Sequence, residues 1–268
     1  MNKLKCISIL SYKSSGSSAC QYLLSSFPEI HHILETRHSF NETLFWTKAS
    51  SVLGQSLQEM IDTEVPFDQE KSRGELITLL ENNVQLFDPD SIANDNELVF
   101  KGWEQLVREH SPVFLEKSPH HLFQWSAIDL MLQGMNNLPE IDFLFIGLIR
   151  NPMDVLYSAW TRWGTPPETG QFEWLTAYQN LLDLREIVGN QLVIVRYEDV
   201  ITDLSHLGPV FDFANVKEYH INEKYFHVKS LSKWKFDNSF VFELEEEVFE
   251  LAMKFGYKTE ELINIKTN

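Results

Sequence analysis

The sequence has few cysteines and no long apolar run. Cys6 and Cys20 are its only cysteines, and two thiols provide neither a disulfide framework nor a cysteine-based metal site. No apolar segment approaches the length of a membrane-spanning helix. The segment after Lys3 and Lys5 stays apolar for only a few residues, too few for the core of a signal peptide. These absences predict a cytoplasmic protein that does not enter a membrane and that buries both cysteines in its core.

Positive charge is also scarce, since 22 Lys and Arg residues stand against 39 Asp and Glu residues, for a formal net charge of −17. This balance argues against nucleic acid as a partner, because phosphate backbones are bound by basic surfaces. An anionic ligand must be held by a local basic cluster against the overall field, whereas a cationic ligand would be attracted. The 268 residues, 43% of them hydrophobic, are enough for one large domain.

A loop of small residues follows the first apolar run. The pattern predicts a strand over Leu4–Leu10 and a helix over Ser17–Ser26, joined through Tyr12–Ser18. A strand, a loop and a helix start in this order direct backbone N–H groups and the positive end of the helix dipole to one point. We therefore predict a binding loop for phosphate or sulfate, made of Lys13, Ser14, Ser15, Gly16, Ser17 and Ser18.

Strands and helices continue to alternate along the chain. Further strands are expected at Ile30–Leu34, Val113–Leu115, Phe143–Ile149 and Leu192–Val195. The alternation predicts an α/β fold: a single P-loop-like domain over residues 1–268, with a central parallel sheet flanked by helices. Residues from about 55 to 110 are largely polar and helical in pattern, and we expect them to form a helical insertion or lid.

Charged residues follow the predicted strands. Lys13, Glu35, Lys117 and Arg150 each come at the carboxyl end of a strand or directly after it. Ligands bind outside these ends in parallel sheets, so we expect the four side chains to converge on one site.

The chain also signals a helix start directly after Lys117. Ser118 is a suitable N-cap and Pro119 suits the first helical position. These residues predict a helix start at the strand end, followed by a helix over Phe123–Gln133.

Two of these segments together resemble the sulfotransferases that use 3′-phosphoadenosine-5′-phosphosulfate (PAPS). They are Lys13–Ser18 and the combination of Arg150-Asn151-Pro152 with Ser158. The resemblance implies that the first segment cradles the 5′-phosphosulfate, and that Arg150 and Ser158 bind the 3′-phosphate. The loop differs from that of nucleotide hydrolases, because its lysine precedes Gly16 and no Gly-Lys-Ser or Gly-Lys-Thr follows.

Three further segments are similar to those of tyrosylprotein sulfotransferases. Glu35-Thr36-Arg37 is similar to the segment that carries their catalytic base, and Lys117-Ser118-Pro119 to the turn whose lysine reaches the sulfate. Leu231-Ser232-Lys233-Trp234 resembles the late segment that closes over the cofactor. A lysine at position 13 is instead usual in carbohydrate and small-molecule members, and bacterial natural-product sulfotransferases share the same motifs.

The resemblance implies a role for each candidate residue. Sulfuryl transfer builds negative charge on the leaving phosphate oxygen, and positioned cations stabilise that charge without a metal ion. We assign Lys13, Lys117 and Glu35 to catalysis, with Glu35 as the base that accepts the proton of the acceptor. The cofactor-binding set is Lys13, Ser14, Ser15, Gly16, Ser17, Ser18, Arg150, Ser158, Ser232 and Lys233, to which Lys229 or Ser230 is a candidate addition. Arg37 and His38 are assigned to the acceptor.

Several alternatives stay open from the sequence. Glu35 would be structural if it paired with Arg37 or Lys117, and His38, His120 or His121 would then be rival bases. The acceptor is expected to be a small molecule with a hydroxyl or amine. The acidic composition suggests a cationic natural product such as a guanidinium alkaloid of the saxitoxin type, and a tyrosine or a carbohydrate is the alternative. A nucleotide-dependent kinase or a non-catalytic nucleotide-binding protein of the same fold are the rival functions.

Overall fold

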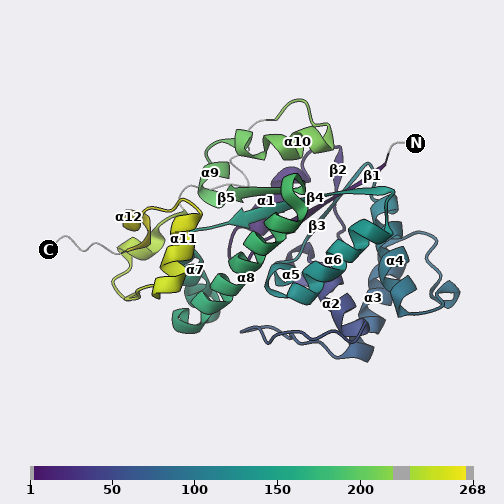
Figure 1. Ribbon diagram of the computed structural model, residues 1–268, viewed down its shortest axis with the longest axis horizontal. Coiled ribbons are helices and arrows are strands. Elements are labelled where there is room, and N and C mark those ends of the chain that lie inside the picture. Colours follow the sequence, from purple (N-terminus) through teal and green to yellow (C-terminus); the bar gives the residue numbers. More distant parts are fainter. Residues whose placement is uncertain (1–2, 220–229, 264–268) are drawn as a thin grey trace.

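The computed structural model describes residues 3–219 and 230–263 of the chain. A five-stranded sheet lies at its centre in the order β2-β3-β1-β4-β5, and every neighbouring pair is parallel (Figure 1). The strands are β1 (Leu4–Leu10), β2 (Ile30–His31), β3 (Val113–Lys117), β4 (Ile141–Ile149) and β5 (Leu192–Arg196). This sheet, with helices around it, confirms the predicted α/β fold class.

Helices cover both faces of the sheet. One face packs against α2 (Phe45–Val52), α3 (Gln69–Asn83), α4 (Asp95–Glu109), α6 (Trp125–Asn137), α8 (Pro167–Val188) and α11 (Glu246–Lys254). The other packs against α1 (Ser17–Leu24), α9 (Tyr197–Val200) and α10 (Gly208–Ala214). Alternate side chains of β1 enter the two cores, Cys6 and Leu10 the first and Ile7 and Ile9 the second. Burial on both faces explains why apolar residues of this strand point to both sides of the sheet, with Lys5 and Ser8 as its two polar residues.

The strand register brings the predicted site residues to one edge of the sheet. Ile9 of β1 lies opposite Lys117 at the end of β3, and Leu10 lies opposite Gly147 of β4. The loop after β1, the end of β3 and Arg150 directly after β4 therefore lie at the carboxyl edge of the sheet. This is the edge at which parallel sheets bind ligands.

The second strand is shorter than expected. Instead of Ile30–Leu34, only Ile30 and His31 pair with β3, opposite Val113 and Phe114. The chain leaves the sheet before it reaches the level of Lys117. The segment around Glu35 is therefore not held at the strand edge, contrary to the prediction.

The helix expected over Phe123–Gln133 is two helices, α5 (His120–Phe123) and α6. They are separated at Gln124, whose side-chain amide exchanges two 2.8 Å hydrogen bonds with the backbone of Gln58. Ser118 does not cap α5, because its hydroxyl accepts from the amide of Leu44 at 2.9 Å. Both differences arise from contacts with segments that are distant in the sequence.

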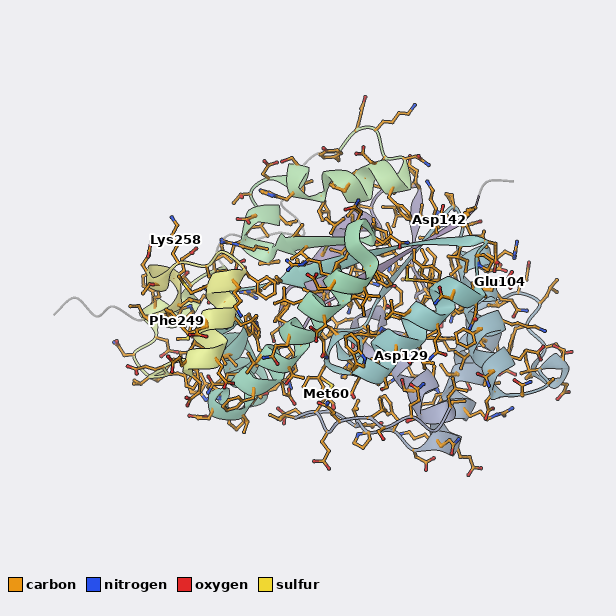
Figure 2. The ribbon with its side chains drawn as sticks, viewed as in Figure 1. Met60, Glu104, Asp129, Asp142, Phe249 and Lys258 are labelled. Carbon is orange, nitrogen blue, oxygen red and sulfur yellow. The ribbon has the colours of Figure 1, made fainter. Side chains whose placement is uncertain are left out.

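The region 55–110 contains two helices and an extended segment. The helices α3 and α4 contribute to the main core, with Leu76, Leu80 and Trp103 fully buried. Residues 53–68, by contrast, are extended and carry a turn near Met60, which Figure 2 labels at the lower side of the view. The helices of this region are therefore part of the core of the domain, whereas the segment 53–68 is not helical.

The last described helices, α11 and α12 (Thr259–Leu262), lie near α7 (Pro152–Trp163) (Figure 1). A short 3₁₀ helix, Lys233–Phe236, buries Trp234 against Met153 and Leu156 of α7. Among the described residues, no helix combines the length and the apolar composition that crossing a bilayer requires.

Candidate functional site

The loop between β1 and α1 bends through two residues with positive φ, Ser14 at 64° and Gly16 at 88°. The amide of Ser15 donates to the carbonyl of Tyr12 at 3.3 Å, which closes the turn. Gly16 is the N-cap of α1, and no side chain caps the helix. The N–H groups of the first turn, which begins at Ser17, therefore lack intrahelical partners, as an anion-binding helix start requires.

Gly16 lies directly under an aromatic ring. A Cβ atom at this position would lie 2.4 Å from Cε2 of Tyr197, the first residue of α9. The same ring lies 5.0 Å from the guanidinium carbon of Arg150. The positive φ and the close approach together require glycine here. Tyr197 thus connects the end of β5 to both the loop and Arg150.

Arg150 is 7% exposed and binds two segments that are far apart in the sequence. Its Nη1 donates to the carbonyl of Ser14 at 3.1 Å, and its Nη2 donates to the carbonyl of Ser230 at 2.9 Å. A guanidinium carries five N–H donors, so three remain after these two bonds. The end of β4 is thereby tied to the loop and to the segment before Trp234.

Three buried polar atoms in these residues have no hydrogen-bond partner within the described part of the chain. They are Oγ of Ser14, Nε of Arg150 and Oγ of Ser230. Leaving a buried donor unpaired costs free energy, and hydroxyl and guanidinium groups are typical phosphate ligands. The residues present therefore fit the phosphate groups of a nucleotide.

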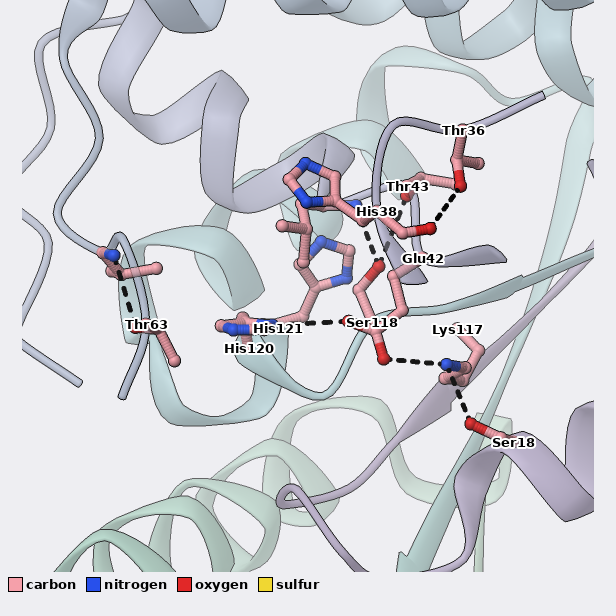
Figure 3. Close-up of polar contacts among 12 residues, drawn as sticks. Ser18, Thr36, His38, Glu42, Thr43, Thr63, Lys117, Ser118, His120 and His121 are labelled. Carbon is pink, nitrogen blue, oxygen red and sulfur yellow. Dashed lines mark hydrogen bonds and ion pairs between the residues drawn. The ribbon is translucent and has the colours of Figure 1, made fainter. Parts of the chain in front are cut away.

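Lys117 is fully buried at the end of β3. Its ammonium donates to Oε1 of Glu42 at 2.9 Å and to Oγ of Ser18 in α1 at 3.3 Å (Figure 3). The second contact places the cation beside the first turn of the helix that follows the loop. Lys117 and the predicted anion-binding loop, which the sequence predicts to converge, are thus in direct contact through Ser18.

Lys13 lies on the same loop and faces the extended segment 53–68. Its Nζ donates to the carbonyl of Ile61 at 2.7 Å and lies 3.3 Å from Oε2 of Glu173. That carboxylate also accepts from the hydroxyl of Tyr12 at 2.6 Å and from the amide of Ile61. The segment 53–68 is therefore held next to Lys13 by hydrogen bonds of Ile61 to Lys13 and to the buried carboxylate of Glu173 in α8.

The charge environment around Glu42 differs from that of an ordinary surface carboxylate. Burial raises the pKa of Glu42 above its usual range, and the positive charge of Lys117 opposes that rise. Its Oε2 lies 3.8 Å from Nδ1 of His120. Burial, together with nearby positive charges that include Lys13 and Lys117, lowers the pKa of His120 to about 3. His120 is therefore uncharged at neutral pH.

Glu35 is not brought to this centre. Its side chain is exposed, and its carbonyl accepts from the side-chain amide of Asn83 of α3 at 2.8 Å. It lines a shallow hollow together with Thr36, Arg37, His38, Thr43, Lys48, Glu75, Thr78, Leu79 and Asn82. Neither Lys13 nor Lys117 lines this hollow.

His38 and Arg37 lie beside the same hollow. Nε2 of His38 is 2.7 Å from the ammonium of Lys48 and 3.9 Å from a carboxylate oxygen of Glu75. Burial and the charge of Lys48 lower the pKa of His38, and the charge of Arg37 also acts on Lys48. Both residues assigned to the acceptor therefore face α2 and α3.

The late segment lies against the start of α7. The amide of Ser232 donates to Oδ1 of Asp154 at 2.7 Å, while the side chain of Lys233 is exposed. Ser158 is half-buried on α7, about two turns beyond Arg150. Lys229 lies outside the described residues.

Three residues of this site have no role in the sequence-based prediction, namely Glu42, Glu173 and Tyr197. Glu42 and Glu173 come from segments with no recognisable motif, so only the folded chain shows their contacts with the two lysines. Tyr197 does carry a signal, because it directly follows a predicted buried strand.

Comparison with known proteins shows the family to which the chain belongs. The model of the sulfotransferase family matches residues 7–217, which is most of the chain. The protein therefore belongs to the sulfotransferase family. It is an enzyme that transfers a sulfuryl group.

Two solved structures share the fold over nearly the whole chain. The sulfotransferase domain from the Synechococcus PCC 7002 olefin synthase has a TM-score of 0.62 and 21% identity, and the match covers 96% of each chain. The sulfotransferase domain from the curacin biosynthetic pathway has a TM-score of 0.58 and 18% identity, covering 94% of this chain and 97% of that one. No curated protein matches the sequence.

Proposed function

We propose that this sulfotransferase uses PAPS as its donor substrate and a small molecule with a hydroxyl or amine as its acceptor. The observation that carries the proposal is the direct contact between Arg150 and the loop, together with three buried donor atoms there that lack a partner among the described residues. This arrangement suits a nucleotide with phosphate groups at two places. A simple phosphate monoester would need only the loop.

Each group of residues contacts a different part of PAPS in this proposal. The loop residues Ser14–Ser18 and the N-terminus of α1 bind the 5′-phosphosulfate, and Arg150 with Ser158 binds the 3′-phosphate. PAPS supplies the sulfuryl group as a mixed anhydride with phosphate. Lys117 and Lys13 hold the negative charge that develops on the sulfate and the leaving oxygen. Ser232 and Lys233 cover the nucleotide next to Arg150.

Lys13 must exchange partners for this role. Its ammonium is bound to the carbonyl of Ile61 and lies beside Glu173, so both contacts weaken when an anion enters the loop. The segment 53–68 then acts as the part of the structure that adjusts to the donor. The carboxylate of Glu173 keeps two other donors, Tyr12 and the amide of Ile61.

The acceptor class is supported by two observations. One similar domain comes from an olefin synthase and the other from the curacin biosynthetic pathway, as their names state. The net charge of −17 favours an acceptor that carries positive charge. We propose a natural-product acceptor, and a cationic guanidinium compound as the narrower hypothesis, with tyrosine and carbohydrate acceptors as the alternatives to be tested.

The test is a transfer assay with the full chain and PAPS labelled with ³⁵S. The acceptor panel contains guanidinium compounds, phenols, a tyrosine peptide, sugars and alkyl alcohols. Labelled product with any member supports the proposal, and the preferred member gives the acceptor class. Donor binding without any transfer would instead support a non-catalytic nucleotide-binding protein. Magnesium-dependent ATP binding in place of PAPS binding would support a kinase.

A further inference from the structure

We infer that Glu42, rather than Glu35, accepts the proton of the acceptor at the reacting centre. The inference rests on the proposed function, because it concerns the same transfer reaction. Glu42 is the carboxylate that contacts Lys117, and Lys117 in turn contacts the first turn of α1. No role follows for Glu42 from the motifs of the sequence.

The backbone around Glu42 is held in a strained shape. Phe40, Asn41 and Leu44 all have positive φ, between 51° and 62°, although none is glycine. Such conformations cost about 1 kcal/mol or more for each residue and persist only where surrounding contacts enforce them. Strain on this scale is typical of segments that position a functional side chain.

Hydrogen bonds to the end of β3 enforce this shape. The hydroxyl of Thr43 donates to Oε1 of Glu116 at 2.9 Å, and the amide of Leu44 donates to Oγ of Ser118 at 2.9 Å. Ser118 also donates to Glu116 at 2.6 Å, so one buried network holds both residues. Glu116 and Ser118 flank Lys117 in the chain. The network therefore fixes Glu42 next to that lysine (Figure 3).

The two carboxylate oxygens of Glu42 have different surroundings. Oε1 accepts from Lys117, whereas Oε2 faces the ring of His120 at 3.8 Å and accepts no hydrogen bond within the described residues. The side chain is 14% exposed, so it is accessible from one side. An oxygen with a free lone pair beside a cation that binds the sulfuryl group meets the geometric need of a general base.

The other candidate bases are less well placed. The side chain of Glu35 is exposed, and its backbone carbonyl accepts a hydrogen bond from Asn83 of α3. The ring of His38 is hydrogen-bonded to the ammonium of Lys48. Glu173 already accepts from Tyr12 and Ile61.

The two histidines of α5 are no better placed. Nε2 of His121 accepts from the amide of Trp46 at 3.2 Å, so the ring is held in the core. With a pKa lowered to about 3, His120 is a weaker base than Glu42.

In the proposed step the acceptor O–H or N–H bond breaks, and the proton moves to Oε2 of Glu42. The acceptor atom forms a bond to sulfur with the electron pair that it gains. The bond between sulfur and the bridging oxygen breaks, and that oxygen leaves with its electron pair on 3′-phosphoadenosine 5′-phosphate (PAP). The charge on the leaving oxygen is held by Lys117 and Lys13.

The state of Glu42 depends on charges from two elements. In β3, Lys117 lowers the pKa of Glu42 and Glu116 raises it. In α5, His121 lowers this pKa, and His120 lies beside the carboxylate without a charge. Burial outweighs these effects and raises the pKa of Glu42. The carboxylate therefore loses its basic form on acidification at a higher pH than an exposed glutamate would. Activity should fall on the acid side with that pKa, and the fall should be absent in Glu42→Gln.

The experiment compares Glu42→Gln with the matched control Glu35→Gln. Release of PAP from PAPS is followed with 4-methylphenol, which keeps its proton at the assay pH, and with 4-nitrophenol, which is largely ionised. Release without phenol measures transfer to water. PAP affinity is measured by calorimetry for each protein.

For Glu42→Gln we expect kcat/KM with 4-methylphenol to fall about 100-fold or more. The rate of PAP release without phenol should fall to a similar extent. The loss with 4-nitrophenol should be much smaller, because that acceptor has already lost its proton. PAP affinity should not change, and Glu35→Gln should behave as the wild type. A general loss of folding is excluded by the unchanged PAP affinity.

Four results would overturn the inference. Equal losses with both phenols, or a parallel loss of PAP affinity, would mean that Glu42 only positions Lys117. A loss confined to Glu35→Gln would return the role to Glu35. Wild-type protein that does not bind PAP would overturn the proposed function itself, and the inference with it.

Discussion

The guanidinium of Arg150 donates a hydrogen bond to the carbonyl oxygen of Ser14 at 3.1 Å. This bond joins the end of β4 to the loop after β1, which are neighbouring strands in the sheet. In the proposed function the loop binds one anionic group and Arg150 binds another, so this bond would set how far apart the two groups lie. The spacing of the two proposed phosphate positions would then be fixed by the sheet rather than by a flexible segment.

Gly16→Ala is expected to impair both folding and nucleotide binding. The new Cβ would lie 2.4 Å from the ring of Tyr197, at a φ of 88° that disfavours any side chain. The ring must move, and it contacts Arg150 as well. Thermal denaturation with and without PAP should show a lower midpoint and little stabilisation by PAP.

Gly164→Ala is the matched control for this variant. Gly164 also has a positive φ, 74°, but a Cβ there meets nothing within 4 Å. The substitution should cost about 1 kcal/mol of unfolding free energy from backbone strain alone and leave PAP binding intact. Equal PAP binding by the two variants would contradict the role given to the contact between Gly16 and Tyr197.

Lys117→Met should lower turnover by about 100- to 1,000-fold, because one cation at the transferring group is lost. The substitution also leaves Glu42 buried without its partner, so some loss of stability is expected. The double variant Lys117→Met with Glu42→Gln removes that unpaired charge. It should recover stability, measured by urea denaturation. Because Glu42 is the inferred base, turnover should stay low in the double variant, and recovered turnover would contradict the roles given to both residues.

Unfolding free energy should fall as the pH rises from about 4 to 6, through Asp154. Burial raises the pKa of this carboxyl from 3.8 to about 6, and the charge of Arg150 opposes the rise. The folded state therefore binds a proton more tightly than the unfolded state, and that stabilisation is lost as the pH passes the raised pKa. The loss amounts to roughly 2–3 kcal/mol.

Asp154→Asn should remove this pH dependence and keep the bond from the amide of Ser232, since an amide oxygen also accepts. Urea denaturation between pH 4 and 7 measures the effect. Asp183→Asn, at an exposed position of α8, should leave the pH dependence as in the wild type. An unchanged slope in Asp154→Asn would show that another group causes it.

The parts of the site that follow strands could be predicted from the sequence. Buried parallel strands are unbroken apolar runs, so their ends are visible, and Lys13, Lys117 and Arg150 stand at or directly after those ends. Small residues around Gly16 mark the tight turn before α1. Local signals of this kind do not depend on how distant segments pack.

The parts that depend on long-range contacts could not be predicted. The exit of the chain from the sheet after His31 decides where Glu35 lies, and it depends on pairing with β3. The position of Glu42 is set by hydrogen bonds from Thr43 to Glu116 in β3 and from Leu44 to Ser118 directly after β3, both far later in the sequence. The break at Gln124 likewise needs the backbone of Gln58.

Calorimetry with PAP on the wild-type protein and on Arg150→Ala tests the central claim most directly. The account predicts that the wild type binds PAP in the absence of magnesium, and that Arg150→Ala loses at least about tenfold in affinity while it stays folded. The exposed Arg185→Ala is the control and should bind as the wild type does. No binding by the wild type, or undiminished binding by Arg150→Ala, would contradict the account.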